Sequence, residues 1–106
     1  MKEELILDFK HKVLKVKKEK DGFSFSINDK SVFIPQSSLF EVLSLLDSLF
    51  YGVLRENKSV QGTDGYLVFL RGQDKWGIRI GKDQDREVVY LSRVDIRTIY
   101  YFLLLS

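Results

Sequence analysis

The fold class follows from one stretch of the chain, residues 22–52, which reads GFSFSINDKSVFIPQSSLFEVLSLLDSLFYG. Over residues 23–28 apolar residues alternate with small polar ones, and this period of two predicts a β-strand. Residues 28–30 (Asn-Asp-Lys) are typical of a tight turn, and residues 31–34 are a second apolar strand closed by Pro35. This stretch therefore begins with a β-hairpin.

The second part of the stretch predicts an amphipathic helix. Apolar residues recur there every three to four positions, which places them on one face of a helix. Ser38 and Glu41 have the spacing of a capping box at its start. Gly52 is a typical end, because glycine readily adopts the left-handed conformation that follows a helix.

The segment before this stretch also has a strand pattern, with one irregularity. Residues 5–9 alternate, but after His11 the apolar positions change parity, so that Leu14 and Val16 become the apolar ones. A parity change inside one extended run predicts a β-bulge near residues 11–13. If a turn stands there instead, the segment supplies two strands.

The second half of the chain repeats the order of the first. Its pattern predicts three strands, a charged loop over residues 82–87, and a final helix that begins at Ser92 with Asp95 in the first turn. The polar residues 55–65 hold either a short strand or a loop. The predicted strands are 66–71, 76–80 and 88–91.

An internal duplication connects the two halves. Residues 32–46 align with residues 89–103 without gaps, strand on strand and helix on helix. We therefore expect one α+β domain, 1–106, made of pseudo-repeats 1–52 and 53–106. Each repeat has antiparallel strands followed by a helix (β-β-β(-β)-α).

Both helices carry more apolar residues than one face can hold. We expect the pairing of the two halves to bury this excess, because about fifty residues form a poor core alone. Any surplus apolar surface would favour a homodimer. The excess residues are Phe40, Leu45, Phe102 and Leu104.

Composition narrows the possible functions. The chain has no cysteine and one histidine, His11, which excludes thiolate sites and metal sites built from several histidines. The net charge is only +2, but residues 9–20 contain six lysines and one glutamate. Such a basic strip is typical of polyanion binding, and it is equally typical of a solvated edge strand. Neither terminus predicts a signal peptide or a membrane span, so we expect an intracellular, cytoplasmic protein that does not enter membranes.

The stretch 22–52 resembles a PUR repeat, the unit of purine-rich-element-binding proteins. The similar features are the hairpin, the aliphatic strand ending in Pro35, the short polar link, and a helix with Leu39-Phe40 near its start. Whirly proteins, the guide-RNA-binding proteins of kinetoplastid mitochondria and p15-type transcriptional coactivators share this order of elements. The resemblance implies a protein that binds single-stranded DNA or RNA and forms a pseudo-twofold or true dimer of antiparallel sheets, with helices on one side.

Single-strand binding requires cations for the phosphates and exposed aromatic rings for the bases. The candidates on predicted strands are Lys10, Lys12, Lys15, Lys17, Phe25, Phe69, Arg71, Lys75, Trp76 and Arg79, and Tyr66 and Tyr90 are further stacking candidates. Aromatic residues that alternate with polar ones are also typical of a half-buried core. The sequence leaves both interpretations open.

We therefore expect a single-stranded nucleic-acid-binding protein without cofactor, metal or catalysis. Carboxylates such as Asp83 and Asp85 lie in loops expected to be exposed, whereas a general acid needs a shielded environment. The alternative is a protein-interaction module that dimerises through its apolar helices, with lysines that only confer solubility.

Overall fold

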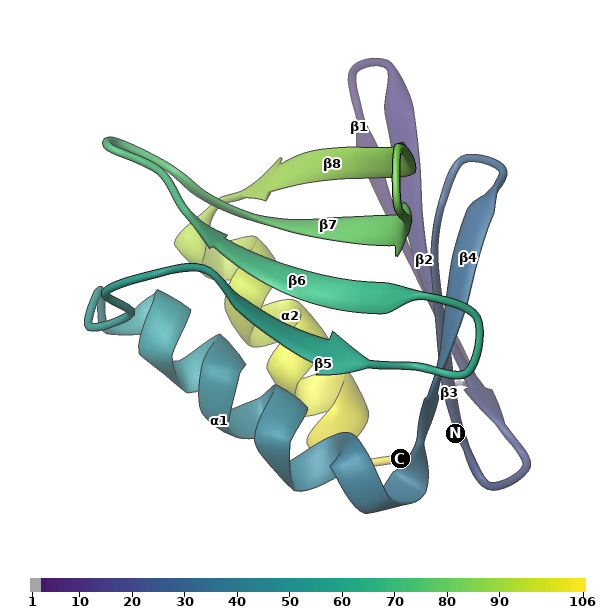
Figure 1. Cartoon of the computed structure of the whole chain (residues 1–106). Helices are drawn as coiled ribbons and strands as arrows, with labels where there is room; N and C mark the ends of the chain where they lie inside the picture. Colours follow the sequence, from purple (N-terminus) through teal and green to yellow (C-terminus); the bar gives the residue numbers. More distant parts are fainter. Residues whose placement is uncertain (1–2) are drawn as a thin grey trace.

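The computed structural model describes residues 3–106, which form eight strands and two main helices (Figure 1). A single 3-10 turn, η1, precedes the first helix. In chain order the elements are β1 (Glu4–Phe9), β2 (Lys12–Glu19), β3 (Gly22–Ile27), β4 (Lys30–Pro35), η1 (Gln36–Ser38), α1 (Leu39–Phe50), β5 (Lys58–Gln61), β6 (Tyr66–Arg71), β7 (Trp76–Lys82), β8 (Asp85–Leu91) and α2 (Arg93–Leu104).

The strands form two antiparallel sheets, each of which is followed by a helix. The first sheet has the order β1-β2-β3-β4 and the second sheet has the order β5-β6-β7-β8. Every neighbouring pair is antiparallel and consecutive in sequence, so each sheet is a simple meander. The predicted α+β fold with a duplicated unit is therefore confirmed, with four strands in each half.

The fourth strand of the first half comes from a turn that the sequence left open. Phe9 pairs with Lys12, so Lys10 and His11 form a two-residue turn between β1 and β2. The predicted bulge near residues 11–13 is wrong. A reversal of the chain changes the apolar parity just as a bulge does, and the local pattern does not distinguish them.

Two segments without a clear strand pattern contribute to the second sheet. Lys82 pairs with Asp85, so only residues 83–84 turn between β7 and β8, and the charged loop expected over 82–87 is wrong. Asp83 adopts φ 54° in this turn, a conformation that aspartate tolerates better than most residues. Residues 55–65, where the sequence left a short strand or a loop open, contain the short strand β5.

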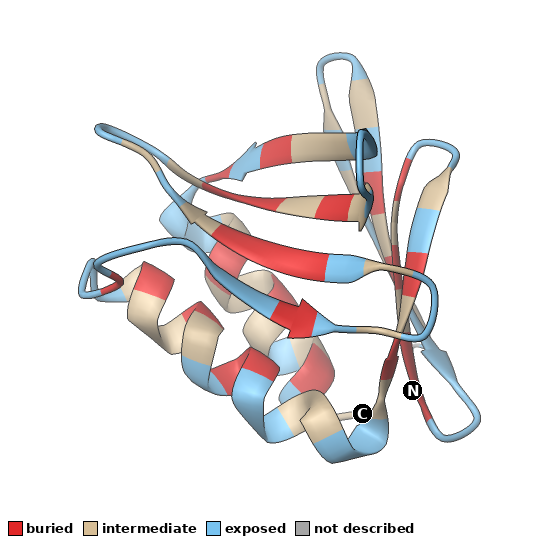
Figure 2. Ribbon diagram, viewed as in Figure 1, coloured by how far each residue is buried: buried red, intermediate tan, exposed pale blue. Residues whose placement is uncertain are grey.

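One hydrophobic core joins the two halves. The inner faces of both sheets and the facing sides of both helices contribute to a single cluster of buried residues. The two sheets cross each other, and the helix pair closes the space between them (Figures 1 and 2). α1 packs against β5 and β6, while α2 packs against β1 and β8. The opposite face of each sheet is left without a helix.

The two helices lie side by side and run antiparallel. The guanidinium of Arg93, at the start of α2, lies 4.3 Å from the ring centroid of Phe50, at the end of α1. The helices are joined by an ion pair in which Arg97 Nη1 donates to Asp47 Oδ1 at 2.8 Å. Desolvation lowers the pKa of Arg97, but the hydrogen bond to Asp47 and the nearby tyrosines outweigh it and the pKa is raised.

The predicted helix boundaries are partly confirmed. The Ser92 hydroxyl accepts from the Asp95 amide, and the Asp95 carboxylate accepts from the Ser92 amide, which is a complete capping box. Ser38 makes no such bond, because η1 already leads the chain into α1, and the capping box expected there is wrong. Gly52 follows α1 with φ 69°, as expected of a helix end.

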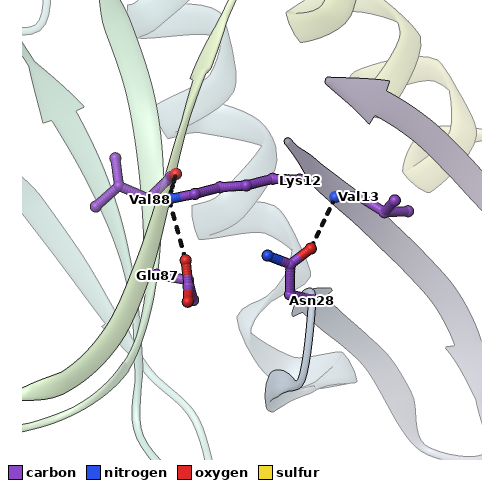
Figure 3. Close-up of polar contacts among 5 residues, drawn as sticks. All are labelled: Lys12, Val13, Asn28, Glu87 and Val88. Atoms are coloured by element: carbon purple, nitrogen blue, oxygen red, sulfur yellow. Dashed lines mark hydrogen bonds and ion pairs between the residues drawn. The ribbon is translucent and has the colours of Figure 1, made fainter. Parts of the chain in front are cut away.

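Contacts between the sheets fix their crossing. Lys12 Nζ donates to the Val88 carbonyl at 2.8 Å and pairs with Glu87 Oε1 at 3.0 Å, so it connects β2 with β8 (Figure 3). Lys30 pairs with Asp85 at 2.6 Å, and this hydrogen bond raises the pKa of Lys30.

Farther along β4, an edge strand of the first sheet, the loop between β5 and β6 lies against this strand. The Thr63 amide donates to the Phe33 carbonyl at 3.0 Å. A Cβ at position 62 would collide with Val32 and with that carbonyl, so only glycine allows the loop to approach this closely.

The excess apolar residues of the helices are only partly covered. Leu45 and Phe102 are half-buried against the core, as expected. Phe40 remains 83% exposed and Leu104 48% exposed, so the expectation that pairing the halves buries them is wrong. The two helices pack on the sheets with their inner sides and leave these positions facing outward.

Candidate nucleic-acid interface

The helix-free face of the second sheet carries cations and aromatic rings together. Strand register places three rows of facing residues on it. The residues that alternate with these rows along each strand, such as Leu67 and Ile78, point into the core. We call this surface the outer face of the second sheet. Its rows are Tyr66–Gly81–Arg86, Val68–Arg79–Val88 and Leu70–Gly77–Tyr90.

A shallow depression of about 290 Å³ lies on this outer face. Arg79 on β7 lies in the middle row, and Arg86 reaches the depression from the neighbouring edge strand β8. Tyr66 and Asp83 lie on the same rim. Two guanidiniums against one carboxylate give the depression a positive balance, which favours an anionic ligand.

The outer face presents two tyrosine rings that a base can reach. Tyr66 is 45% exposed and Tyr90 is 51% exposed. A Cβ at position 77 would lie 3.0 Å from Tyr90 Cδ1, so the Tyr90 ring lies directly against the backbone of Gly77. Lys75 Nζ lies 4.7 Å from the Tyr90 ring centroid, a cation–π contact that brings a third cation to this face.

The corresponding face of the first sheet is basic and rich in serine. Lys15 pairs with Ser26 and Lys17 pairs with Ser24 across β2 and β3, so all four side chains share the helix-free face. Lys15 Nζ lies 4.0 Å from Glu4 Oε1, a contact that leaves its charge largely exposed. This face therefore offers cations and hydroxyl groups, which suit phosphate contacts.

Two of the predicted stacking residues do not lie where a base can reach them. Phe25 is 2% exposed and Phe69 is 1% exposed, both in the core, so their stacking role is wrong. Trp76 packs half-buried against the same cluster, and its stacking role stays a prediction. The burial of the two phenylalanines has a physical reason. Alternation identifies which residues share a face, and the more apolar face is the one that turns inward.

The predicted cations divide into three groups. Lys15 and Lys17 lie on the helix-free face of the first sheet. Arg79 lies on the outer face of the second sheet, and Lys75 lies over the Tyr90 ring on that same face. Lys10 and Arg71 are exposed at strand ends, away from the three rows of the outer face. Lys12 is occupied by Glu87 and the Val88 carbonyl, so the structure does not support its predicted role in phosphate contact.

Arg86 is the residue of the depression that sequence reasoning missed. The signal is present, because Arg86 has the same parity as Val88 and Tyr90 and opposite parity to the buried Val89 and Leu91. This alternation can be applied to Arg86 only once β8 is known to begin at Asp85, because a loop was expected over residues 82–87.

No protein-family model, no curated protein and no solved structure gives a significant match to this chain. The similarity to PUR repeats thus rests on the sequence pattern and the order of elements. Within residues 3–106, no helix is long and apolar enough to cross a membrane.

Proposed function

We propose that this protein binds single-stranded DNA or RNA in the cytoplasm through the outer faces of its two sheets, without catalysis. One observation carries the proposal. The outer face of the second sheet, which no helix covers, combines Arg79, Arg86 and the exposed Tyr66 around one depression, with a second exposed tyrosine, Tyr90, in a neighbouring row.

The charges account for the phosphate part of such binding. Arg79, Arg86 and Lys75 lie within one sheet face, so the phosphates of a flexible strand can contact more than one of them. Each phosphate neutralised on a single strand contributes about −0.7 to the slope of log K against log salt concentration. Two or three contacts on this face give a slope of about −1.4 to −2.

The tyrosines account for the base part. A base stacked on an aromatic side chain contributes about 1–3 kcal/mol, and the face of any base can make this contact. A duplex keeps its bases stacked inside the helix and cannot offer them to Tyr66 or Tyr90. Single strands are therefore preferred to duplexes, and sequence preference is weak.

The test is fluorescence anisotropy with labelled single-stranded DNA and RNA of mixed sequence at low salt. The double variant Arg79→Gln/Arg86→Gln removes two cations from the depression, and its salt slope falls by about 1.4. Arg55→Gln/Lys58→Gln is the matched control, because it also removes two exposed cations, one in the loop between α1 and β5 and one at the first residue of β5, away from the outer face. Equal affinity of the double variant and the control for every oligonucleotide would refute this use of the outer face.

The second candidate function is assembly: a homodimer formed through α1 and α2, without nucleic-acid binding. The observation that favours it is the exposed apolar surface of the helix pair. The same oligonucleotides distinguish the two functions, since a protein that only assembles shows no anisotropy change.

A further inference from the structure

The side of the helix pair that faces away from the sheets is unusually apolar. Helical spacing places Val94 and Tyr101 of α2 on one stripe with Leu105, the residue that caps this helix. Phe40 of α1 lies on the adjoining stripe with Tyr51, which caps α1. All five are exposed. We call this surface the helix face; it also includes Leu104, in the last turn of α2.

The helix face has a groove at one end and a protrusion at the other. The groove, about 650 Å³ and open to solvent, is lined by Phe50, Arg93, Val94, Arg97, Thr98 and Tyr101. Arg97 connects two of the surrounding residues: its guanidinium lies 3.8 Å from the Phe50 ring centroid and forms an ion pair with Asp47.

The protrusion is Phe40, the most exposed large apolar residue of residues 3–106. It lies ten positions before Phe50 on α1, or about 15 Å along the helix at 1.5 Å per residue. A protrusion and a groove on one face are the arrangement that a twofold axis makes self-complementary. Each copy then inserts its protrusion into the groove of the other.

The size of the helix face agrees with a dimer contact. Its six exposed apolar side chains retain between 48% and 83% of their accessible surface. Since a whole aromatic side chain has about 150–250 Å² and Leu or Val somewhat less, they present on the order of 700 Å². A standard interface buries about 800 Å² on each partner, and the largest apolar patch of a typical monomer is about 300–600 Å².

The charges on the helix face are also placed so that two copies related by a twofold axis complement each other. Glu41 adjoins the protrusion, and Arg93 lines the groove. Both are exposed, and neither has an ion-pair partner within residues 3–106. When Phe40 of one copy enters the groove of the other, Glu41 approaches Arg93 of that copy, and the twofold axis repeats the pair.

We infer that the occupant of this surface is a second copy of the same chain, docked across a twofold axis with Phe40 in the partner's groove and Glu41 beside the partner's Arg93. This inference rests on the homodimer put forward above and specifies its interface. It leaves the outer faces of both sheets free in the dimer, so each dimer presents two copies of the candidate nucleic-acid interface.

The test measures mass in solution by sedimentation or light scattering, without nucleic acid. Wild-type protein has twice the mass of the 12.4 kDa chain at micromolar concentration. Phe40→Ser shifts it to the monomer, and its exposure means that the fold of each copy is retained. Ile6→Ser is the matched control, because Ile6 is also exposed, at 52%, but lies on β1.

Charge variants test the pairing itself. Glu41→Arg alone and Arg93→Glu alone each bring like charges together and give monomers. An equimolar mixture of the two single variants restores the dimer, because each chain then supplies the charge that the other lacks.

The possible outcomes separate this inference from the nucleic-acid proposal. A monomeric wild type, or a mass above the dimer, overturns the interface, since a twofold contact closes at two copies. A dimer unaffected by Phe40→Ser and by both charge variants also overturns it, though not the homodimer. Failure of a dimer to bind oligonucleotides overturns only the proposed binding.

Discussion

Replacing Tyr66 by alanine removes one proposed base-stacking ring while leaving the charges of the outer face unchanged. The ring lies on the rim of the depression beside Arg79 and Arg86. Because it is 45% exposed and outside the buried core, the substitution is expected to change the stability of the fold little.

The magnitude follows from the exposed part of the ring. A fully available stacking platform contributes about 1–3 kcal/mol for each base. Since somewhat less than half of Tyr66 is exposed, the lower half of that range applies, and Tyr66→Ala weakens binding by about 5- to 30-fold. Tyr66→Phe keeps the ring and binds like wild type.

The assay is anisotropy with two labelled strands of equal length and phosphate number, one of them abasic. Wild type prefers the strand with bases, and Tyr66→Ala loses part of this preference, because Tyr90 still offers a ring, while its salt slope stays the same. If the variant still discriminates the two strands as wild type does, then Tyr66 does not stack on a base.

Three further predictions test other parts of the account. Gly62→Ala lowers the free energy of unfolding in urea by about 1–3 kcal/mol, because the new Cβ collides with β4. Ser92→Ala lowers it by about 1 kcal/mol through loss of the capping box, whereas Ser38→Ala, which has no cap to lose, changes it little. Lys12→Gln lowers the free energy of unfolding by about 0.5–1.5 kcal/mol and leaves oligonucleotide affinity unchanged. Lys15→Gln weakens oligonucleotide binding and leaves the free energy of unfolding unchanged. An affinity loss in the Lys12 variant as large as that in the Lys15 variant would contradict the inter-sheet role of Lys12.

Sequence patterns predicted those features that depend on neighbours in the chain. The hairpin of β3 and β4 and the capping box at Ser92 are local, and both are present. The duplication was predictable because both halves repeat the same hydrophobic periodicity. The turn at residues 10–11 was ambiguous, because a bulge and a reversal of the chain both change the parity of the apolar positions.

Contacts between distant segments account for the failures. Lys12 was assigned to a ligand, and its partner Glu87 lies on the other sheet, 75 positions away. Nothing near Lys12 in the sequence indicates that contact. Phe25 alternates with serine, a pattern that left stacking and a core position both open, and the structure places the phenylalanine side in the core.

The helices show how a correct pattern can lead to a wrong expectation. Their excess of apolar residues is real, and the sequence indicated a surface in need of cover. Pairing the two halves was expected to provide it, yet Phe40 stays exposed because α1 and α2 contact each other and the sheets with different sides. Leu45 and Phe102 are covered within the chain, and we propose that the exposed remainder is covered by a second chain.

Salt-dependent binding to single-stranded and duplex forms of one oligonucleotide sequence is the most direct test of the proposed single-strand binding. We expect measurable binding to the single strand at low salt, weaker binding to the duplex, and affinity for the single strand that falls as salt increases. Absence of binding to either single-stranded DNA or single-stranded RNA at low salt would contradict it, as would equal affinity for strand and duplex.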